Sequence, residues 1–185
     1  MDSARILYYF LIYLSCLWTT YAHEPNEAYF NFNLKENTVE IEAELPWTMR
    51  HALILFNPSL EHSRSKRDFK DTFVQYIKKN LVLKNKNGNL LEYKAFKEIE
   101  KSQHAHQSNF LIIFKGNSLS TVYNTIMFNL YENQTNYNTL ESTSKTYETN
   151  NTSMSFTLGE KNNKNLWYLG ILAIAILYIA YLKCR

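Results

Sequence analysis

The residues of this chain that could do chemistry are chiefly histidines. His23 follows Thr20-Tyr21-Ala22, a pattern that predicts signal-peptide cleavage after Ala22. Cleavage there makes His23 the mature N-terminus, where the amine and one imidazole nitrogen form a chelating pair suited to copper or nickel. His104 and His106 are the candidates for further ligands, because residues two apart project to the same face of a strand. We therefore consider these three histidines as a copper or nickel site.

The same histidines have an alternative interpretation in which no metal binds. A histidine often follows a signal peptide, and a His-x-His pair in a polar loop is often merely solvated. His51 and His62 are scattered elsewhere, and no methionine cluster or spaced carboxylate accompanies the three candidates. The sequence alone leaves both interpretations open.

No other residue pattern indicates catalysis. Residues 23–165 contain no Gly-rich phosphate loop, no G-x-S-x-G elbow and no cysteine nucleophile. The acid pair Glu98 and Glu100 fits the solvated face of a strand better than a hydrolytic dyad. The basic run at residues 64–70 could contact anionic lipid or polymer, although a solvated loop explains it better. We predict that the chain is not an enzyme.

The N-terminal segment predicts export. Residues 6–18 form an apolar run of 13 residues after Arg5. This run is too short to cross the roughly 30 Å hydrocarbon core of a bilayer, and it is typical of a signal peptide, here residues 1–22. The alternatives are an uncleaved N-terminal anchor and a lipoprotein site at Cys16.

The C-terminal segment predicts a single membrane span. Residues 166–182 are 17 residues without charge or proline, with aromatic residues at both borders. Lys183 and Arg185 follow directly, and positive charge favours the cytoplasmic side. Residues 183–185 are then a cytoplasmic tail, and everything before Leu166 faces the periplasm or the cell exterior. A sorting signal that is later removed is the alternative, but no LPxTG-like motif precedes the span.

The charge and the cysteine positions restrict the functions and the stabilising interactions that are open to the exported segment, residues 23–165. The formal net charge of +3 comes mainly from the membrane-flanking ends, so the exported segment is nearly balanced and nucleic-acid binding is not indicated. The two cysteines, Cys16 and Cys184, fall outside that segment, so no disulfide can stabilise it. Its stability must come from packing.

The exported segment begins with a pattern of period two. Residues 28–34 alternate apolar and polar side chains, and residues 38–46, TVEIEAELP, alternate more clearly until Pro46 ends the run. The short turn between them predicts a hairpin with one solvated face. Residues 47–56 fit either a buried strand or a short helix.

A helix and further strands follow. Asp68 is the predicted N-cap of a helix over residues 68–81, whose aromatic stripe is suited to core packing. Asn87-Gly88 predicts a hairpin turn between residues 81–83 and 90–93. The later part of the segment predicts strands at 110–114, 121–131 and 153–158, and a polar loop at 133–152.

These elements together predict a mainly β protein. We expect an immunoglobulin-like antiparallel β-sandwich with one inserted α-helix, plus a C-terminal transmembrane helix. The predicted organisation is a signal peptide (1–22), an extracytoplasmic β-sandwich domain (23–159), a stalk (160–165), a transmembrane helix (166–182) and a cytoplasmic tail (183–185).

Two short patterns carry a resemblance. Ala22-His23-Glu24 leads into Ala28-Tyr29-Phe30, and later Phe69-x-x-x-Phe73-x-x-Tyr76 leads into Leu81-x-Leu83 and a turn at Gly88. This order resembles the extracytoplasmic N-terminal domain of hydrogenase and urease accessory membrane proteins, some of which are nickel permeases. It is also similar to small uncharacterised exported β-domains of Bacteroidetes. The permeases have several spans and this chain has one, so the resemblance implies a shared domain and not transport.

The sequence therefore predicts a single-pass, membrane-anchored extracytoplasmic protein. Its role is that of a binding or accessory module for another membrane protein. The alternative is a periplasmic copper- or nickel-binding domain that uses the mature N-terminal histidine. The ligand, the partner and the oligomeric state do not follow from the sequence.

Overall fold

The computed structural model describes residues 24–99, 107–116 and 118–159, and the strands of this part form two β-sheets. The larger sheet has six strands in the order β4-β5-β2-β1-β7-β8, and the smaller has three in the order β3-β6-β9. The larger sheet contains β1 (Glu27–Leu34), β2 (Thr38–Pro46), β4 (Glu92–Ile99), β5 (Gln107–Lys115), β7 (Thr135–Leu140) and β8 (Lys145–Thr149). The smaller contains β3 (Leu81–Asn85), β6 (Leu119–Asn124) and β9 (Ser155–Thr157).

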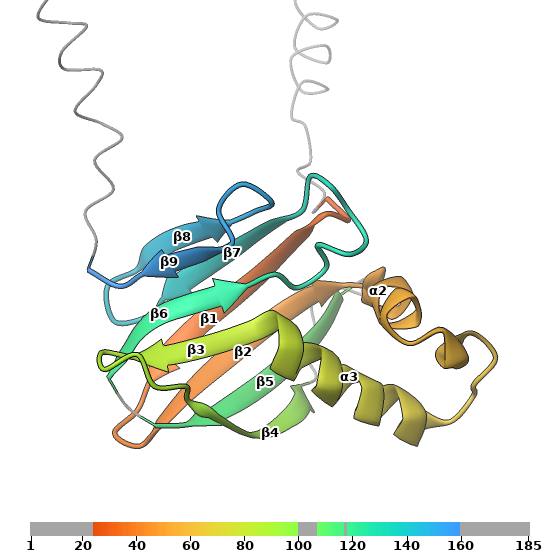
Figure 1. Ribbon diagram of the computed structural model, residues 1–185, viewed down its shortest axis with the longest axis horizontal. Helices are drawn as coiled ribbons and strands as arrows, with labels where there is room; N and C mark the ends of the chain where they lie inside the picture. The colour runs from red at the N-terminus through yellow and green to blue at the C-terminus, as the bar shows by residue number, and fades with distance from the viewer. Residues whose placement is uncertain (1–23, 100–106, 117, 160–185) are drawn as a thin grey trace, which may run out of the picture.

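The predicted hairpin at the start of the domain is confirmed. β1 and β2 pair antiparallel, with Phe30 opposite Ala43 and Phe32 opposite Ile41. Their alternate residues are buried, and β2 ends at Pro46 as the alternation predicts. Figure 1 shows the smaller sheet over one face of the larger one. Contact between the Phe32 ring of β1 and the Phe156 ring of β9, 6.3 Å between centroids, joins the two layers.

The prediction of a polar loop over residues 133–152 is wrong. This segment forms β7 and β8, and β7 pairs parallel with β1, so the larger sheet is mixed and not wholly antiparallel. The segment lacks the apolar alternation of a half-buried strand because two of its inward positions are Asn136 and Asn138, both completely buried. Polar residues are stable at such positions only when their amides are hydrogen-bonded.

Those hydrogen bonds form a buried amide network between the sheets. The Asn124 amide of β6 donates to Asn138 Oδ1 at 2.8 Å, and Asn124 Oδ1 accepts from the Asn136 amide at 3.2 Å. The Asn136 amide also donates to the Ile126 carbonyl, and the Thr149 hydroxyl donates to the Asn124 carbonyl at 2.9 Å. The network therefore fixes one strand of the smaller sheet against two strands of the larger one.

The turn at Asn87-Gly88 is present, but the hairpin predicted around it is wrong. Gly88 has a φ of +81°, and its N–H donates to the Asn85 carbonyl at 2.9 Å. Beyond a single bridge between Lys84 and Leu90, β3 pairs with β6 in the smaller sheet and β4 pairs with β5 in the larger one. The turn thus carries the chain from one sheet to the other.

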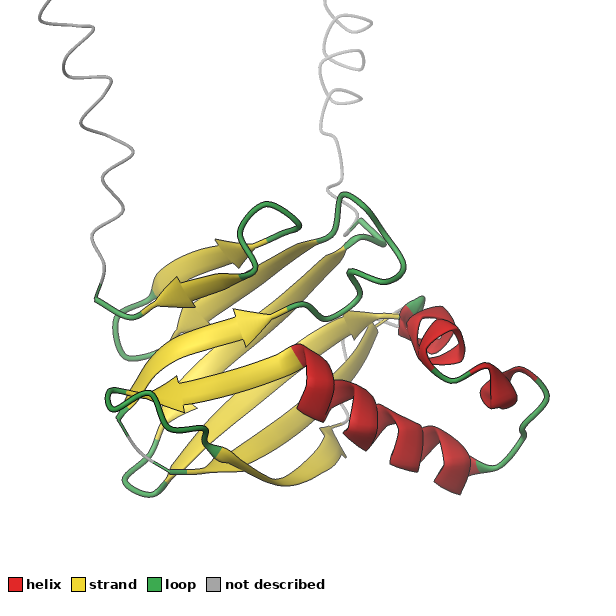
Figure 2. Cartoon of the chain, viewed as in Figure 1, coloured by secondary structure: helices red, strands yellow, loops and turns green. Residues whose placement is uncertain are grey.

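Two α-helices accompany the sheets, α2 (Met49–Phe56) and α3 (Lys66–Asn80), joined through the 3-10 helix η1 (Pro58–Glu61). Helix α3 packs on the face of the larger sheet that also carries the smaller sheet. The sequence predicted only one inserted helix. The N-cap of α3 is Ser65 and not Asp68, because the Ser65 hydroxyl accepts the Asp68 N–H at 3.3 Å. Figure 2 shows both helices together at one side of the sheets. Phe73 of α3 packs on Phe96 and Phe110 of the larger sheet.

The predicted membrane segments are outside the described residues. These are the signal peptide at 1–22, the stalk at 160–165, the span at 166–182 and the tail at 183–185. Within the described part of the chain, no helix is both long and apolar enough to cross a bilayer.

The amide network generates a stability prediction. Replacing Asn124 with leucine leaves the Asn138 oxygen and the Ile126 N–H without their partner, so we expect a loss of about 3 kcal/mol in the free energy of unfolding. The control is Asn33→Ala. Asn33 lies on the face of β1 opposite to the buried Phe32, so its replacement should change the free energy of unfolding by less than about 0.5 kcal/mol. Urea unfolding followed by circular dichroism measures both, and equal effects would contradict a structural role for the network.

Candidate functional site

The predicted metal ligands His23, His104 and His106 lie outside the described residues. Their described neighbours in the sequence, Glu24 and Gln107, belong to segments that meet at one end of the larger sheet. β1 begins there, and β5 begins opposite Pro46, the last residue of β2. The structure thus brings the segments next to the predicted ligands to one end of the larger sheet. The three ligands themselves are not among the described residues.

The two histidines that the structure describes do not form a site. His51 is exposed on α2, where its ring meets the edge of Trp47 at 5.9 Å between centroids. His62 is exposed after η1. Across residues 24–99, 107–116 and 118–159, no group of three or more histidine, cysteine, aspartate or glutamate side chains could hold a metal ion.

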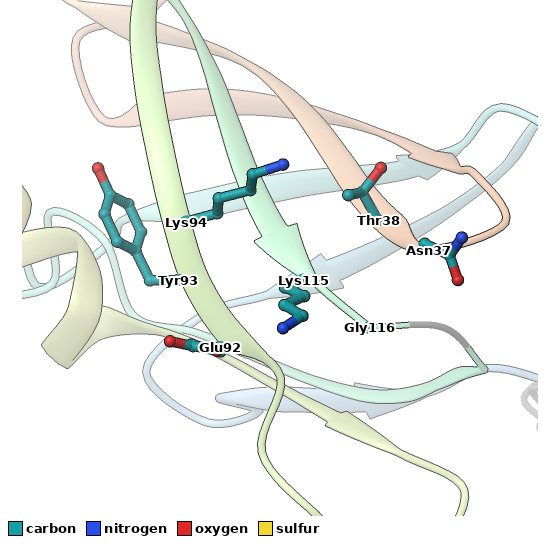
Figure 3. Close-up of a pocket in the computed structure, with 7 residues that line it drawn as sticks. All are labelled: Asn37, Thr38, Glu92, Tyr93, Lys94, Lys115 and Gly116. Atoms are coloured by element: carbon teal, nitrogen blue, oxygen red, sulfur yellow. The ribbon is translucent and has the colours of Figure 1, made fainter.

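A cleft of about 650 Å³ opens at the other end of the larger sheet (Figure 3). The residues that line it come from the β1–β2 turn, from the start of β4 and from the end of β5: Asn37, Thr38, Glu92, Tyr93, Lys94, Lys115 and Gly116. A bulge between Tyr93 and Ala95 interrupts the pairing of β4 with β5. Figure 3 shows Lys94 and Lys115 extending in opposite directions, so their ammonium groups do not converge on one ligand.

Gly116 closes the inner wall of this cleft. Its N–H donates to the Asn37 carbonyl at 2.9 Å, which ties the end of β5 to the β1–β2 turn. Its φ of +133° is a conformation that residues with a Cβ rarely adopt. A Cβ there would lie 2.9 Å from Cγ of the buried Leu91. The requirement for glycine is therefore structural, and the cleft lacks the convergent polar groups of a built ligand site.

A second candidate lies on the face of the larger sheet that points away from the smaller sheet. Tyr29 of β1 and Tyr137 of β7 are register partners, and their rings stack at 5.2 Å with an interplanar angle of 16°. The Glu27 carboxylate accepts both hydroxyls, at 2.6 Å from Tyr29 and 3.3 Å from Tyr137. Glu44 lies opposite Tyr29, and Glu148 lies opposite Tyr137. We call these five residues the tyrosine face.

The electrostatics of the tyrosine face are strongly negative. Burial raises the pKa of Tyr29, and the hydrogen bond and charge of Glu27 raise that pKa further. Burial and then the charges of Glu27 and Glu148 raise the pKa of Tyr137. Both tyrosines are therefore neutral at physiological pH. The face combines two uncharged aromatic rings with the neighbouring carboxylates of Glu27, Glu44 and Glu148. Such an arrangement is suited to a cationic group of a partner.

Sequence reasoning missed this face because it treated the strand of Tyr137 as a loop. The signal was present as the alternation of Asn136 and Asn138 with Tyr137 and Thr139, a period of two made with polar residues. Of the other charged groups that sequence analysis named, Glu100 lies outside the described residues and the others are exposed. Glu98 lies on β4, and the basic run at 64–70 spans the start of α3, where Arg67 pairs with Asp71 at 3.7 Å.

Comparison with known proteins adds no family to these observations. Neither a scan against protein-family models nor a search of the curated proteins gives a match to this chain.

The two turn glycines give a matched test of the cleft wall. Gly116→Ala brings a Cβ against Leu91 at a positive φ, so we expect a loss of about 2–3 kcal/mol in the free energy of unfolding. Gly88→Ala also has a positive φ, but nothing lies within 4 Å of the added Cβ, so its loss should stay near about 1 kcal/mol. Denaturant unfolding of both variants measures the difference. An equal loss in the two would show that contact with Leu91 contributes nothing.

Proposed function

We propose that this chain is a single-pass, membrane-anchored protein whose β domain faces the periplasm or the cell exterior and binds another membrane protein. In this proposal the domain acts as an accessory module without catalysis. The observation that carries it is the tyrosine face, where a stacked tyrosine pair and three carboxylates lie on the side of the larger sheet that points away from the smaller sheet.

The residue types of this face are those of an interface. Tyrosine supplies a large, rigid contact area with a polar tip, and it is enriched where proteins bind one another. Hydrogen bonds from both hydroxyls to Glu27 hold the two rings in place before any partner arrives, which reduces the entropy lost on binding. The carboxylates Glu44 and Glu148 favour a partner surface that presents lysine or arginine.

We infer that the two facing sheets belong to the broad group of immunoglobulin-like sandwiches, a group in which many cell-surface binding domains are found. The resemblance to the extracytoplasmic domain of hydrogenase and urease accessory membrane proteins supports an accessory role. Transport is not proposed, because the sequence contains one predicted span.

Site-specific photo-crosslinking tests the partner. A photoreactive phenylalanine in place of Tyr137, in the full chain in membranes of the source cells, should give one discrete adduct with an integral membrane protein. The control position is Tyr123 of β6, which is 40% exposed on the smaller sheet and should give no such adduct. Glu44→Lys with Glu148→Lys should reduce the adduct at position 137 about tenfold, because like charges then oppose each other. No adduct at 137, or the same adducts at both positions, would contradict the proposal.

A copper- or nickel-binding domain is the second candidate. The observation that favours it is that the described neighbours of His23 and of His104 and His106 lie at one end of the larger sheet, with only β2 between β1 and β5. Strands two apart in a sheet are separated by about 10 Å, which histidine side chains can bridge around an ion.

Metal titration separates this candidate from the first. If the site exists, calorimetric titration of the purified mature chain with Cu²⁺ or Ni²⁺ gives one binding step. Replacing His104 and His106 with alanine should then weaken binding at least about tenfold, while the exposed His62→Ala leaves it unchanged. N-terminal sequencing must also find His23 first. Equal affinity in both variants, or a mature chain that starts elsewhere, would remove this candidate.

A further inference from the structure

An exposed apolar stripe runs along the solvent side of α2. It consists of His51 and Leu55, whose spacing of four residues places them on one side of α2, and of Trp47, which lies just before the helix with its ring against His51. Trp47 is 62% exposed and Leu55 is 58% exposed. The opposite side of the helix carries the buried residues Met49, Ala52 and Leu53. α2 therefore presents apolar side chains in both directions, and only one of these sides packs on the domain.

The stripe is held in position by the fold. The Thr48 hydroxyl, next to Trp47, donates to the Pro25 carbonyl at 3.3 Å, so the start of α2 is tied to the N-terminal end of the described domain. The edge-on contact of the Trp47 ring with His51 fixes the stripe along the helix. An exposed tryptophan and leucine that are held in fixed positions form an apolar surface suited to contact with lipid or with an apolar surface of another protein.

The segment from α2 into the start of α3 carries more basic than acidic side chains. The Arg50 guanidinium lies 4.2 Å over the Phe69 ring of α3, between the stripe and the first turns of that helix. The exposed charged residues of this region are the cations Arg50, Arg64, Lys66, Arg67 and Lys70 and the anions Glu61, Asp68 and Asp71. The balance within residues 47–71 is positive, which favours an anionic surface on the side of the stripe that faces α3.

We propose that the α2 stripe docks on the surface of an anionic lipid bilayer. Trp47 and Leu55 enter the interfacial region, where a tryptophan ring is most stable, and the basic residues meet lipid phosphates. This inference rests on the proposed membrane anchor. The stalk between Gly159 and the predicted span is six residues, at most about 21 Å when extended, which keeps the domain close to the lipid surface.

The size of the stripe favours lipid over a protein partner. A stable protein interface buries about 800 Å² on each side, more than three side chains in one row provide. A bilayer makes no such demand, because the anchor already holds the stripe at a high effective concentration near the lipid. A few interfacial side chains are then sufficient to orient the domain.

Fluorescence quenching by lipids tests this docking in the full chain. With Cys16 and Cys184 replaced by serine, a single cysteine at Leu55 carries an environment-sensitive dye, and the control carries it at Leu90, which is 67% exposed in the turn between the sheets. Both chains are reconstituted at low density in phosphatidylcholine vesicles with or without phosphatidylglycerol, using lipids that carry a quencher. We expect quenching at 55 at least about three times that at 90, and a decrease when phosphatidylglycerol is omitted.

The outcomes are distinct. Equal quenching at the two positions would overturn the docking, and equal quenching at 55 with and without phosphatidylglycerol would overturn the role of the basic residues. A shielded dye at 55 that lipid quenchers do not reach would indicate contact with a second copy, which also overturns the proposal. Alkaline extraction of the same vesicles tests the anchor separately. Release of the chain contradicts the proposed function, whereas retention without quenching contradicts the docking alone.

Discussion

The two sheets are joined by buried amides that have no access to water. Asn124, Asn136 and Asn138 are all completely buried, and each amide that loses its partner would cost about 1–3 kcal/mol. Hydrogen bonds between amides are directional, so β6 can satisfy β7 and β8 in one alignment only, whereas an apolar contact would tolerate sliding. The parallel pairing of β7 with β1, and hence the tyrosine face on the other side of β7, depends on this alignment.

The sequence correctly predicted the elements whose buried side chains are mostly apolar. The alternation of TVEIEAELP identified β2 and its buried face, and the aromatic spacing of residues 69–77 identified α3. It failed where polar residues face the core, since nothing in the composition of β7 distinguishes a buried amide from a solvated one. It also failed where tertiary contact decides the pairing. The Asn87-Gly88 turn is local and was predicted, but the separation of β3 and β4 into different sheets depends on partners far along the chain.

The candidate sites divide in the same way. Histidines are visible in a sequence because a single residue type suggests the chemistry, and the three predicted ligands lie outside the residues that the structure describes. The tyrosine face depends instead on residues that are distant in the chain and adjacent across parallel strands. The role of Gly116 also depends on a long-range neighbour, because only contact with Leu91 distinguishes it from Gly88. Residue identity therefore suggested the histidine site, whereas the tyrosine face and the role of Gly116 follow only from the pairing of distant strands.

The tyrosine face and the α2 stripe lie close together along β2. Glu44 belongs to the first and Trp47 to the second, and the three residues from one to the other span at most about 11 Å. The segment before β1 joins them as well, since Glu27 binds both tyrosines while Pro25 accepts the hydrogen bond of Thr48. A domain that rests on lipid through α2 would therefore hold the tyrosine face near the headgroups. At that height the extracytoplasmic loops of a neighbouring membrane protein are within reach, and lipid docking and partner binding use different surfaces. A basic loop of the partner would also offset the repulsion between the carboxylates of the tyrosine face and anionic headgroups.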